Sequence, residues 1–485
     1  MSTPHFDVLI LGAGLSGIGA ACHLTRKLKG KTYAILERRE AIGGTWDLFR
    51  YPGIRSDSDM STFGFNFRPW REPKVLADGA SIKRYVSETA ERYHVTPHIR
   101  FGRKVVHAAW SSTQARWTVA AHNAESGQDE TYTARFLIAA TGYYNYDAGY
   151  SPDFPGRDSF AGKIVHPQQW PENLDYNGKK VVIIGSGATA ITLVPSMAAG
   201  GAHVTMLQRS PTYVLSVPSV DPLWHTLSRV LPTKLVYAAT RARNIALQRA
   251  LFVASRERPK VVRRLLRGLT KHQLGKNVDI KHFSPRYNPW DERLCVVPDG
   301  DLFRMLRKRR ARIVTDTIKT FDATGIQLDS GEHLDADIVV TATGLNLQLF
   351  GGAQMTVDGE PVVIKDHLVY KGMMVDGVPN LLAITGYTNA SWTLKADIVC
   401  EHFIRMMAHM DKKKLKVVIP RANGIQRTEE TVMGSLASGY VRRGADSLPR
   451  QGDQAPWTVL NDYLRDAAAL KFGRVTNPAL EYHAR

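Results

Sequence analysis

A glycine-rich pattern occurs twice in this chain, each time directly after a short apolar run. The first copy is Gly12-Ala-Gly-Leu-Ser-Gly17 after Phe6–Leu11, and the second is Gly185-Ser-Gly-Ala-Thr-Ala190 after Lys180–Ile184. A segment of helical composition follows each copy. A phosphate group needs close backbone approach without an obstructing Cβ, and it needs the free N–H groups of a helix N-terminus. We therefore predict an α/β fold with two Rossmann-like dinucleotide-binding domains.

The residues that end the next strand of each unit differ in charge. Glu37 closes the first, at Thr32–Leu36, where a carboxylate accepts hydrogen bonds from a ribose diol. Gln208-Arg209-Ser210 closes the second, and a guanidinium clamps a 2′-phosphate that a carboxylate would repel. The ordinary alternative for Arg209 is a solvated cation at a strand end. We predict FAD at the first unit and NADPH, rather than NADH, at the second.

Each unit thus supplies a set of candidate cofactor residues. For FAD they are Gly12, Gly14, Leu15, Ser16, Gly17 and Glu37. For NADPH they are Gly185, Ser186, Gly187, Ala188, Thr189, Arg209 and Ser210. Ala140-Thr-Gly142 and Ala342-Thr-Gly344 each follow an apolar run, where the chain can cross between two nucleotide domains.

Length and composition are those of an ordinary globular protein with two or three domains. The chain has 485 residues, of which 44% are hydrophobic and 22% charged. We expect a discontinuous FAD domain at residues 1–150 and 380–485. We expect the NADPH domain between its parts, at 151–215 and 301–379, with a helical basic insert at 216–300.

The three cysteines argue against two other kinds of site. Cys22, Cys295 and Cys400 are widely separated and form neither a CxxC pair nor a metal-ligand cluster. We expect no metal site, and no pyridine nucleotide–disulfide oxidoreductase, because that class needs a redox cysteine pair.

No apolar run is long enough to span a bilayer, and the N-terminus lacks the pattern of a signal peptide. We therefore expect a cytoplasmic protein.

Two longer patterns narrow the class of enzyme. The fixed positions of the first, FxGxxxHxxxW, are Phe160, Gly162, His166 and Trp170. The second, [A/G]GxWxxxx[F/Y]P[G/M]xxxD, runs from Gly43 to Asp57. On these patterns the chain resembles the class B flavoprotein monooxygenases along essentially its whole length. It is most similar to their Baeyer–Villiger branch, which includes the ethionamide-activating monooxygenase of mycobacteria, and Pro171 after the first pattern also favours this branch.

The resemblance implies a reaction and two catalytic residues. NADPH would reduce FAD, the reduced flavin would capture O2 as a C4a-peroxide, and a ketone would become an ester or lactone, with sulfoxidation as a side activity. Arg293 matches the catalytic arginine, whose guanidinium stays protonated and donates several hydrogen bonds in a fixed fork. Asp57 matches the carboxylate that pairs with it. The alternative activity is a flavin-containing N- or S-oxygenase, and the ordinary alternative for Arg293 is a surface ion pair.

The resemblance also extends the cofactor site. It adds to the FAD set Gly44, Thr45, Trp46, Asp57 and Asn389. His166 is expected in the linker between the domains, where it would transmit the position of the cofactor, and a structural histidine is the alternative. Glu292 stands where related enzymes often carry a lysine near the 2′-phosphate, so Arg209 has to carry more of the NADPH preference. The expected partners are O2 and a small apolar ketone or sulfide; the sequence does not indicate the oligomeric state.

The positive charge of the chain gathers in the predicted helical insert. The net charge is +19, and the segment from Leu223 to Lys276 has thirteen Lys or Arg residues against one acid, Glu257. Apolar residues alternate with these cations, a pattern typical of peripheral contact with an anionic membrane surface. The alternatives are a solvated helical face and a membrane-surface protein without enzymatic activity. Nucleic acid is not expected, because no recognition motif accompanies the charge.

Overall fold

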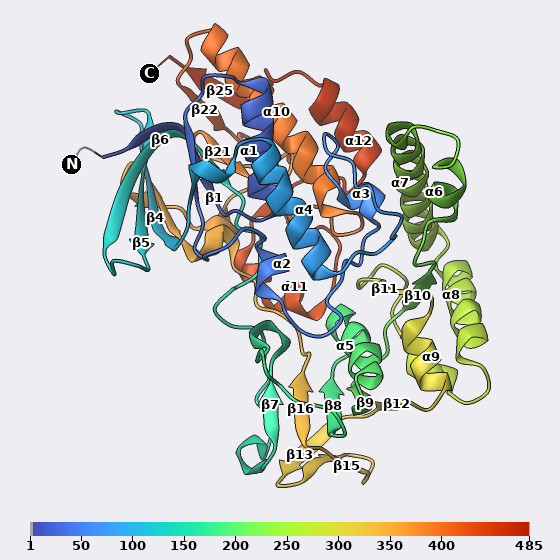
Figure 1. The fold of residues 1–485 in the computed structure, drawn as a ribbon. Helices are drawn as coiled ribbons and strands as arrows, with labels where there is room; N and C mark the ends of the chain where they lie inside the picture. The colour runs from blue at the N-terminus through green and yellow to red at the C-terminus, as the bar shows by residue number, and fades with distance from the viewer. Residues whose placement is uncertain (1–2, 485) are drawn as a thin grey trace.

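The computed structural model describes residues 3–484, in which two separate sheets form two lobes (Figure 1). The larger sheet and its helices make one lobe, and a five-stranded sheet makes the other. Helices α6 (Pro222–Leu227), α7 (Thr233–Glu257) and α8 (Pro259–Leu274) lie along one side of the molecule (Figure 1). Residues 1, 2 and 485, the ends of the predicted FAD domain, lie outside the described residues.

The larger sheet has nine strands and combines parallel with antiparallel pairing. Its parallel part has the order β3-β2-β1-β6, while β4, β5 and β6 form an antiparallel meander. Leu9 and Ile10 in β1 are fully buried, because both faces of the parallel part are covered, as its continuous apolar run indicates. The strands are β1 (His5–Leu11), β2 (Tyr33–Leu36), β3 (Ile99–Arg100), β4 (Arg103–Ser111), β5 (Arg116–Asn123), β6 (Asp129–Ala139), β17 (Gln354–Val357), β18 (Glu360–Pro361) and β21 (Leu381–Ala383).

The smaller sheet is parallel throughout and has the order β12-β9-β8-β16-β7. Helix α5 (Ala188–Ala199) follows β8, so this lobe repeats the strand–turn–helix plan of β1 and α1 (Leu15–Lys27). The strands are β7 (Lys163–Val165), β8 (Lys180–Ile184), β9 (His203–Gln208), β12 (Ala311–Thr315) and β16 (Ile338–Thr341). An antiparallel meander is inserted before β16 and consists of β13 (Ile318–Asp322), β14 (Gly325–Leu328) and β15 (His333–Asp335).

The helical insert leaves and rejoins the second lobe through a pair of parallel strands. These are β10 (Val214–Val217) and β11 (Cys295–Pro298), and α6, α7 and α8 lie between them in the sequence. Helices therefore occupy much of the segment 216–300, where the sequence predicts a helical insert. Among residues 3–484, no helix combines the length and apolarity needed to cross a bilayer.

The chain returns to the larger sheet earlier than the sequence predicts. The predicted NADPH segment ends at residue 379, but β17 pairs in parallel with β4 of the larger sheet, and β18 pairs with β17. The boundary at 379 is therefore wrong for residues 354–361. After β21, which pairs with β6, helix α10 (Trp392–Lys412) packs against α1. The C-terminal segment thus completes the first lobe.

Six further α-helices and three strand pairs occur in the described residues. The helices are α2 (Thr45–Leu48), α3 (Met60–Phe63), α4 (Gly79–Arg92), α9 (Asp301–Arg307), α11 (Gly439–Arg443) and α12 (Tyr463–Ala467). The strand pairs are β19 (Val369–Tyr370) with β20 (Met374–Val375), β22 (Val417–Pro420) with β25 (Leu480–His483), and β23 (Arg427–Thr431) with β24 (Arg450–Gly452).

Candidate active site

A cavity of about 650 Å³ opens between the first glycine-rich turn and helix α7. Almost all of the predicted FAD residues line it: Gly12, Gly14, Leu15, Ser16, Glu37, Gly44, Thr45, Trp46, Asp57 and Asn389. Gly17 lies behind this surface. Its backbone faces Gly12, and a Cβ at Gly17 would stand 1.8 Å from the Gly12 carbonyl oxygen. The turn can close only with glycine there, so this residue shapes the cradle without lining it.

Glu37 is buried at the end of β2 and points back to the glycine-rich turn. The Ala13 N–H donates to its Oε2 at 2.6 Å, and the Arg39 N–H donates to its Oε1 at 2.9 Å. Burial raises the pKa of Glu37, while these two N–H groups and the nearby arginines act in the opposite direction. The carboxylate still lines the cavity, so it can also accept hydrogen bonds from a bound ribose diol.

Three side chains in the cavity wall carry buried acceptors without a partner among residues 3–484. They are Oδ1 of Asn389, Oε1 of Gln348 and, on α7, Oε1 of Gln248. Asn389 Nδ2 is already engaged, because it donates to the Asn461 carbonyl at 2.8 Å. A buried acceptor without a donor is costly, and such atoms are expected where a ligand supplies the missing hydrogen. The glycine cradle, the buried acid and these acceptors together fit an FAD molecule.

Arg293 and Asp57, 236 positions apart, meet at this cavity. Arg293 Nη1 donates to Asp57 Oδ2 at 3.1 Å, and the two side chains are 31% and 40% exposed. Burial lowers the pKa of Arg293, but Tyr440, Tyr143 and Asp57 outweigh it and hold the pKa well above its ordinary value. The arginine therefore keeps its charge at every working pH. The ion pair that the resemblance implies is present.

A pair of tyrosines beside Arg293 was missed in the sequence. Tyr143 and Tyr144 follow directly after Gly142, and their hydroxyls lie 3.0 Å apart. Burial raises the pKa of Tyr144 to about 12 and that of Tyr143 further, so both stay neutral near pH 7. Both line the cavity, and the Tyr143 ring stacks on Trp392 at 5.4 Å between centroids. The repeated aromatic after the Ala-Thr-Gly sequence was the available signal.

The second glycine-rich turn has the predicted form but does not line this cavity. Gly185 has φ +141°, and a Cβ there would lie 2.3 Å from the Ala342 carbonyl oxygen. Ser186 and Gly187 complete the turn, and Ala188 and Thr189 begin α5. Arg209 and Ser210 are exposed just beyond the end of β9. The second set of candidate residues thus forms an open surface at the carboxyl edge of the parallel sheet, where nucleotides bind in such folds.

His166 of the FxGxxxHxxxW pattern lies between two segments of the chain, around residues 149 and 344. The Gln168 N–H donates to His166 Nδ1 at 3.2 Å, so the proton lies on Nε2, which is 3.3 Å from the Gly344 carbonyl oxygen. Burial lowers the pKa of His166, which favours the neutral ring. Gly149 must lack a Cβ, because that atom would lie 1.9 Å from the imidazole. His166 therefore connects the segments around residues 149 and 344, and its proposed role in transmitting the position of the cofactor stays a prediction.

The other members of this pattern are structural. Phe160 is buried in the core below the second sheet, and a Cβ at Gly162 would lie 2.4 Å from the Asp337 carbonyl oxygen. Trp170 is partly buried and packs against the core around α5. None of the three lines the cavity.

The far end of the cavity is formed by residues that the sequence did not single out. Helix α7 contributes Arg243, Asn244, Leu247, Gln248 and Leu251. Leu215, Val217 and Trp290 face them from the β10–β11 region. Trp290 has φ +69°, which is strained for a bulky residue. This end is mostly apolar, and Arg293 also lines the cavity.

Comparison with known proteins places this site in a family. The family described as pyridine nucleotide-disulphide oxidoreductase matches residues 9–225. The probable FAD-binding monooxygenase AlmA of Acinetobacter baylyi is 54% identical over 99% of this chain and 96% of its own length. The FAD-containing monooxygenase EthA of Mycobacterium tuberculosis is 51% identical over 100% of this chain and 99% of its own. The chain belongs to the FAD-containing monooxygenases. The predicted FAD cofactor and the predicted membership of the flavoprotein monooxygenases are confirmed.

A solved structure confirms the fold of this monooxygenase. An oxidized steroid monooxygenase with NADP bound has a TM-score of 0.78 at 22% identity, covering 99% of this chain and 100% of its own. The α/β fold with two dinucleotide-binding domains is therefore confirmed. The match to disulphide oxidoreductases reflects the shared nucleotide fold, since Cys22, Cys295 and Cys400 are each buried and free.

Proposed function

We propose that this FAD-containing monooxygenase uses NADPH and O2 to convert apolar ketones to esters or lactones, a Baeyer–Villiger oxidation. The observation that carries the proposal is the Arg293–Asp57 ion pair at 3.1 Å in the wall of the cavity that fits FAD. The mostly apolar end formed by α7 and the β10–β11 region suits a hydrocarbon substrate.

The residues of this chain have distinct tasks in that reaction. FAD, when bound, supplies the oxygen-activating chemistry. Arg293 places a permanent positive charge where negative charge develops on oxygen, and Asp57 fixes the direction of its guanidinium. Tyr143 and Tyr144 offer neutral hydroxyl donors nearby. In balance, the ketone gains one oxygen atom from O2, the other leaves as water, and NADPH with one proton supplies the two electrons.

The second lobe is the proposed NADPH site. Its glycine-rich turn opens at the N-terminus of α5, which suits a pyrophosphate, and exposed Arg209 lies where a 2′-phosphate would project. The steroid monooxygenase of the same fold binds NADP. Coenzyme bound at the open edge of this sheet would reach the FAD cavity across the linker that His166 holds.

Product analysis with two variants tests the reaction. The holoenzyme, NADPH, O2 and a panel of ketones and thioethers are incubated, and esters and sulfoxides are identified by mass spectrometry. Arg293→Ala should still be reduced by NADPH but lose at least about 100-fold in ester formation, as for removal of one stabilising donor. Arg293→Lys should recover only part, because it keeps the charge and loses the fork. Ester formation at the normal rate in Arg293→Ala, or sulfoxides without esters from the wild type, would contradict the proposal.

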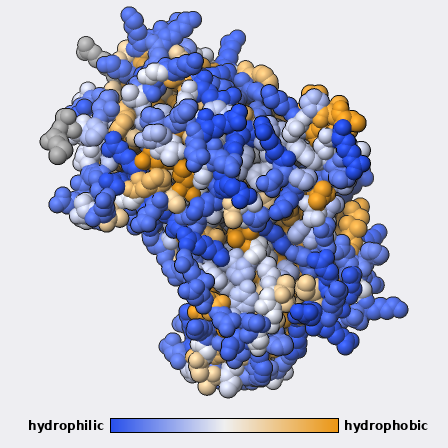
Figure 2. Space-filling model, in the orientation of Figure 1, coloured by the Kyte–Doolittle hydropathy of each residue, from blue (hydrophilic) through white to orange (hydrophobic). Residues whose placement is uncertain are grey.

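We also propose that this enzyme works in the cytoplasm and contacts anionic membrane through α8. Val261, Leu265 and Leu269 are 60%, 56% and 48% exposed and lie on one side of the outer face of α8. The other side carries four cations without ion-pair partners among residues 3–484: Lys260, Arg264, Arg267 and Lys271. Figure 2 shows separate groups of hydrophobic residues along the edge formed by α6, α7 and α8, with hydrophilic residues between them. Such a helix lies in a lipid interface.

Vesicle flotation tests the membrane contact. Wild type should float with vesicles containing phosphatidylglycerol and less at high salt, and Leu265→Glu should reduce binding by about tenfold or more. The control Ala246→Glu adds the same charge to exposed α7. Equal binding by the wild type and Leu265→Glu would rule α8 out.

A further inference from the structure

The middle of helix α7 forms one wall of the cavity but is weakly packed. The buried residues of α7 lie at its two ends: Val236, Tyr237, Thr240, Arg241 and Ser255. None of the residues from 242 to 254 is buried, although Arg243, Asn244, Leu247, Gln248 and Leu251 line the cavity. Buried residues therefore anchor the ends of the helix, and the part that faces the cavity has to be held in another way.

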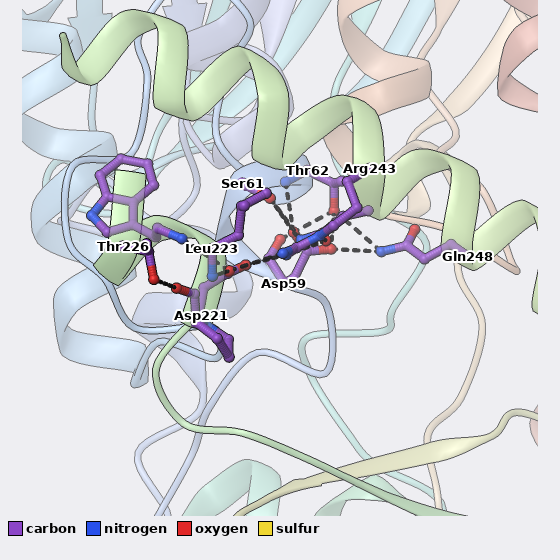
Figure 3. Close-up of polar contacts among 11 residues, drawn as sticks. Asp59, Ser61, Thr62, Asp221, Leu223, Thr226, Arg243 and Gln248 are labelled. Atoms are coloured by element: carbon purple, nitrogen blue, oxygen red, sulfur yellow. Dashed lines mark hydrogen bonds and ion pairs between the residues drawn. The ribbon is translucent and has the colours of Figure 1, made fainter. Parts of the chain in front are cut away.

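Asp59 supplies this attachment on the side of the first lobe. Its Oδ1 accepts from Asn244 Nδ2 at 2.8 Å, and its Oδ2 accepts from Gln248 Nε2 at 2.6 Å. The same carboxylate caps α3, because Oδ1 also accepts from the Thr62 N–H at 3.0 Å. Figure 3 shows Gln248 reaching across from α7 to this carboxylate. Hydrogen bonds to an ionised acceptor are stronger than neutral ones, so one side chain holds two positions of the helix.

A second aspartate, Asp221, holds the neighbouring residue Arg243 of α7 in the same way. Asp221 caps α6, accepting from the Leu223 N–H at 2.9 Å, and it also accepts from Arg243 Nη1 at 3.1 Å (Figure 3). Three neighbouring side chains of α7 thus contact two capping carboxylates. Asp221 fixes α7 within the insert, whereas Asp59 connects Asn244 and Gln248 to the FAD-binding lobe. Two hydroxyls of the same segment add to this contact: Asn244 Nδ2 donates to Ser61 Oγ at 2.9 Å, and Gln248 Nε2 donates to Thr62 Oγ1 at 3.4 Å.

The location of Asp59 gives this contact a consequence for the reaction. Asp57, two residues earlier, holds Arg293, so the segment 57–59 carries the partner of the catalytic arginine and the anchor of the wall. Thr62 Oγ1 also bonds Ser391 Oγ at 2.6 Å, which ties α3 to the loop that carries Asn389. A shift at Asp59 would therefore move α7 relative to Arg293 and to the loop that carries Asn389.

We propose that Asp59 is a positioning residue that fixes the distance between α7 and the reactive centre and thereby sets which lengths of apolar ketone fit. This inference rests on the proposed function for its substrate class. The hydrocarbon chain lies between Leu247 and Leu251 on one side and Leu215, Val217 and Trp290 on the other, while its carbonyl group points to Arg293. Asp59 lines the same cavity, but both of its carboxylate oxygens are engaged by α3 and α7, so the task assigned to it is positioning.

Adding one negative charge on α7 tests the contact between Gln248 and Asp59. Gln248→Glu at pH 8 places a second carboxylate against Asp59, and the two repel each other. The double variant Asp59→Asn with Gln248→Glu restores one donor and one acceptor and keeps the new charge at position 248. Ala246→Glu adds the same charge to the exposed face of α7 and serves as the control.

Two readouts are measured on the holoenzyme. Hydrogen exchange of the α7 amides from 242 to 254 should be at least about tenfold faster in Gln248→Glu, normal in Ala246→Glu, and restored in the double variant. With linear 2-alkanones of six to twelve carbons, KM for the longest should rise by about tenfold or more in Gln248→Glu and return in the double variant, which keeps the charge at position 248.

The two readouts separate this inference from the proposed function. Wild type that makes no ester would contradict the function, and hydrogen exchange would still decide whether Asp59 holds α7. Normal exchange in Gln248→Glu, or fast exchange that persists in the double variant, would overturn the attachment. Restored exchange with a chain-length profile that is identical in all four proteins would overturn the role in selecting substrate.

Discussion

The two dinucleotide units begin with the same strand–turn–helix plan and differ in how far they enclose their ligand. The first unit faces a cavity of about 650 Å³ and ends in Glu37, which is 3% exposed and held by two backbone N–H groups. The second opens at a sheet edge, and Arg209 beyond it is exposed. Enclosure suits a cofactor that stays bound, and an open surface suits a coenzyme that leaves after each turnover. The same motif can therefore serve both tasks, depending on what packs over it.

The largest expected effect comes from substitutions at the third small residue of each glycine-rich motif, which is Gly17 in the first unit and Ala190 in the second. Gly17→Ala would place a Cβ 1.8 Å from the Gly12 carbonyl oxygen, so the turn must move and the FAD cradle with it. We expect a cost of several kcal/mol and loss of bound FAD. The second unit already carries Ala190 at this position, and Ala190→Gly should cost only about 1 kcal/mol, the helix propensity difference. Flavin absorbance per protein and thermal unfolding measure both. Full flavin content in Gly17→Ala would show that the first cradle is not rigid.

Acid should weaken the enclosed lobe through a buried histidine. His402 on α10 is fully buried, and its Nδ1 lies 2.8 Å from the Leu470 carbonyl oxygen. Burial, aided by Lys371 and Arg405, lowers its pKa from 6.5 to about 4. Between pH 6.5 and about 4, His402 is therefore protonated in the unfolded chain but neutral in the folded lobe. Stability is complete above pH 6.5 and falls by about 3 kcal/mol as the pH decreases to 4.

The variant His402→Asn isolates this effect. Asparagine keeps a donor near the Nδ1 position and does not titrate, so the melting temperature of the variant should depend less on pH between 6.5 and 4. His166, whose pKa is also lowered, remains in both proteins and serves as an internal reference. Parallel acid profiles for the wild type and the variant would show that His402 is protonated without cost.

Local patterns predicted the parts of the molecule in which neighbours in sequence are neighbours in space. Both glycine-rich turns, Glu37 at the end of β2 and Arg209 beyond β9 lie where their strand–turn–helix units predict. The pairing of Arg293 with Asp57 came from resemblance to a family, because no periodicity connects residues 236 positions apart.

The wall of the cavity could not be predicted in this way. Asp59 and Gln248 are 189 positions apart, and the cations of the helical insert indicated a membrane contact or a solvated face and not a wall of the cavity. The inner face of α7 acquires its role from Asp59 and Asp221, which belong to other elements. Strands β17 and β18 have only four and two residues, which gives a weak periodic signal, so the return of the chain to the larger sheet was placed too late.

Removing a charge from the second, open nucleotide unit should have a smaller and more selective effect than changing the first, enclosed unit. Removing Arg209 takes away the guanidinium proposed to clamp a 2′-phosphate and leaves the glycine-rich turn intact. Arg209→Ala should therefore raise KM for NADPH by about 10- to 100-fold, or roughly 1.4–2.7 kcal/mol, and change KM for NADH by less than about twofold. Arg209→Lys should lie between, because it keeps the charge but not the fork. Steady-state reduction with both coenzymes measures this, and flavin content should stay normal throughout. An equal loss for NADPH and NADH would mean that Arg209 supports the fold of the strand end and does not read the phosphate.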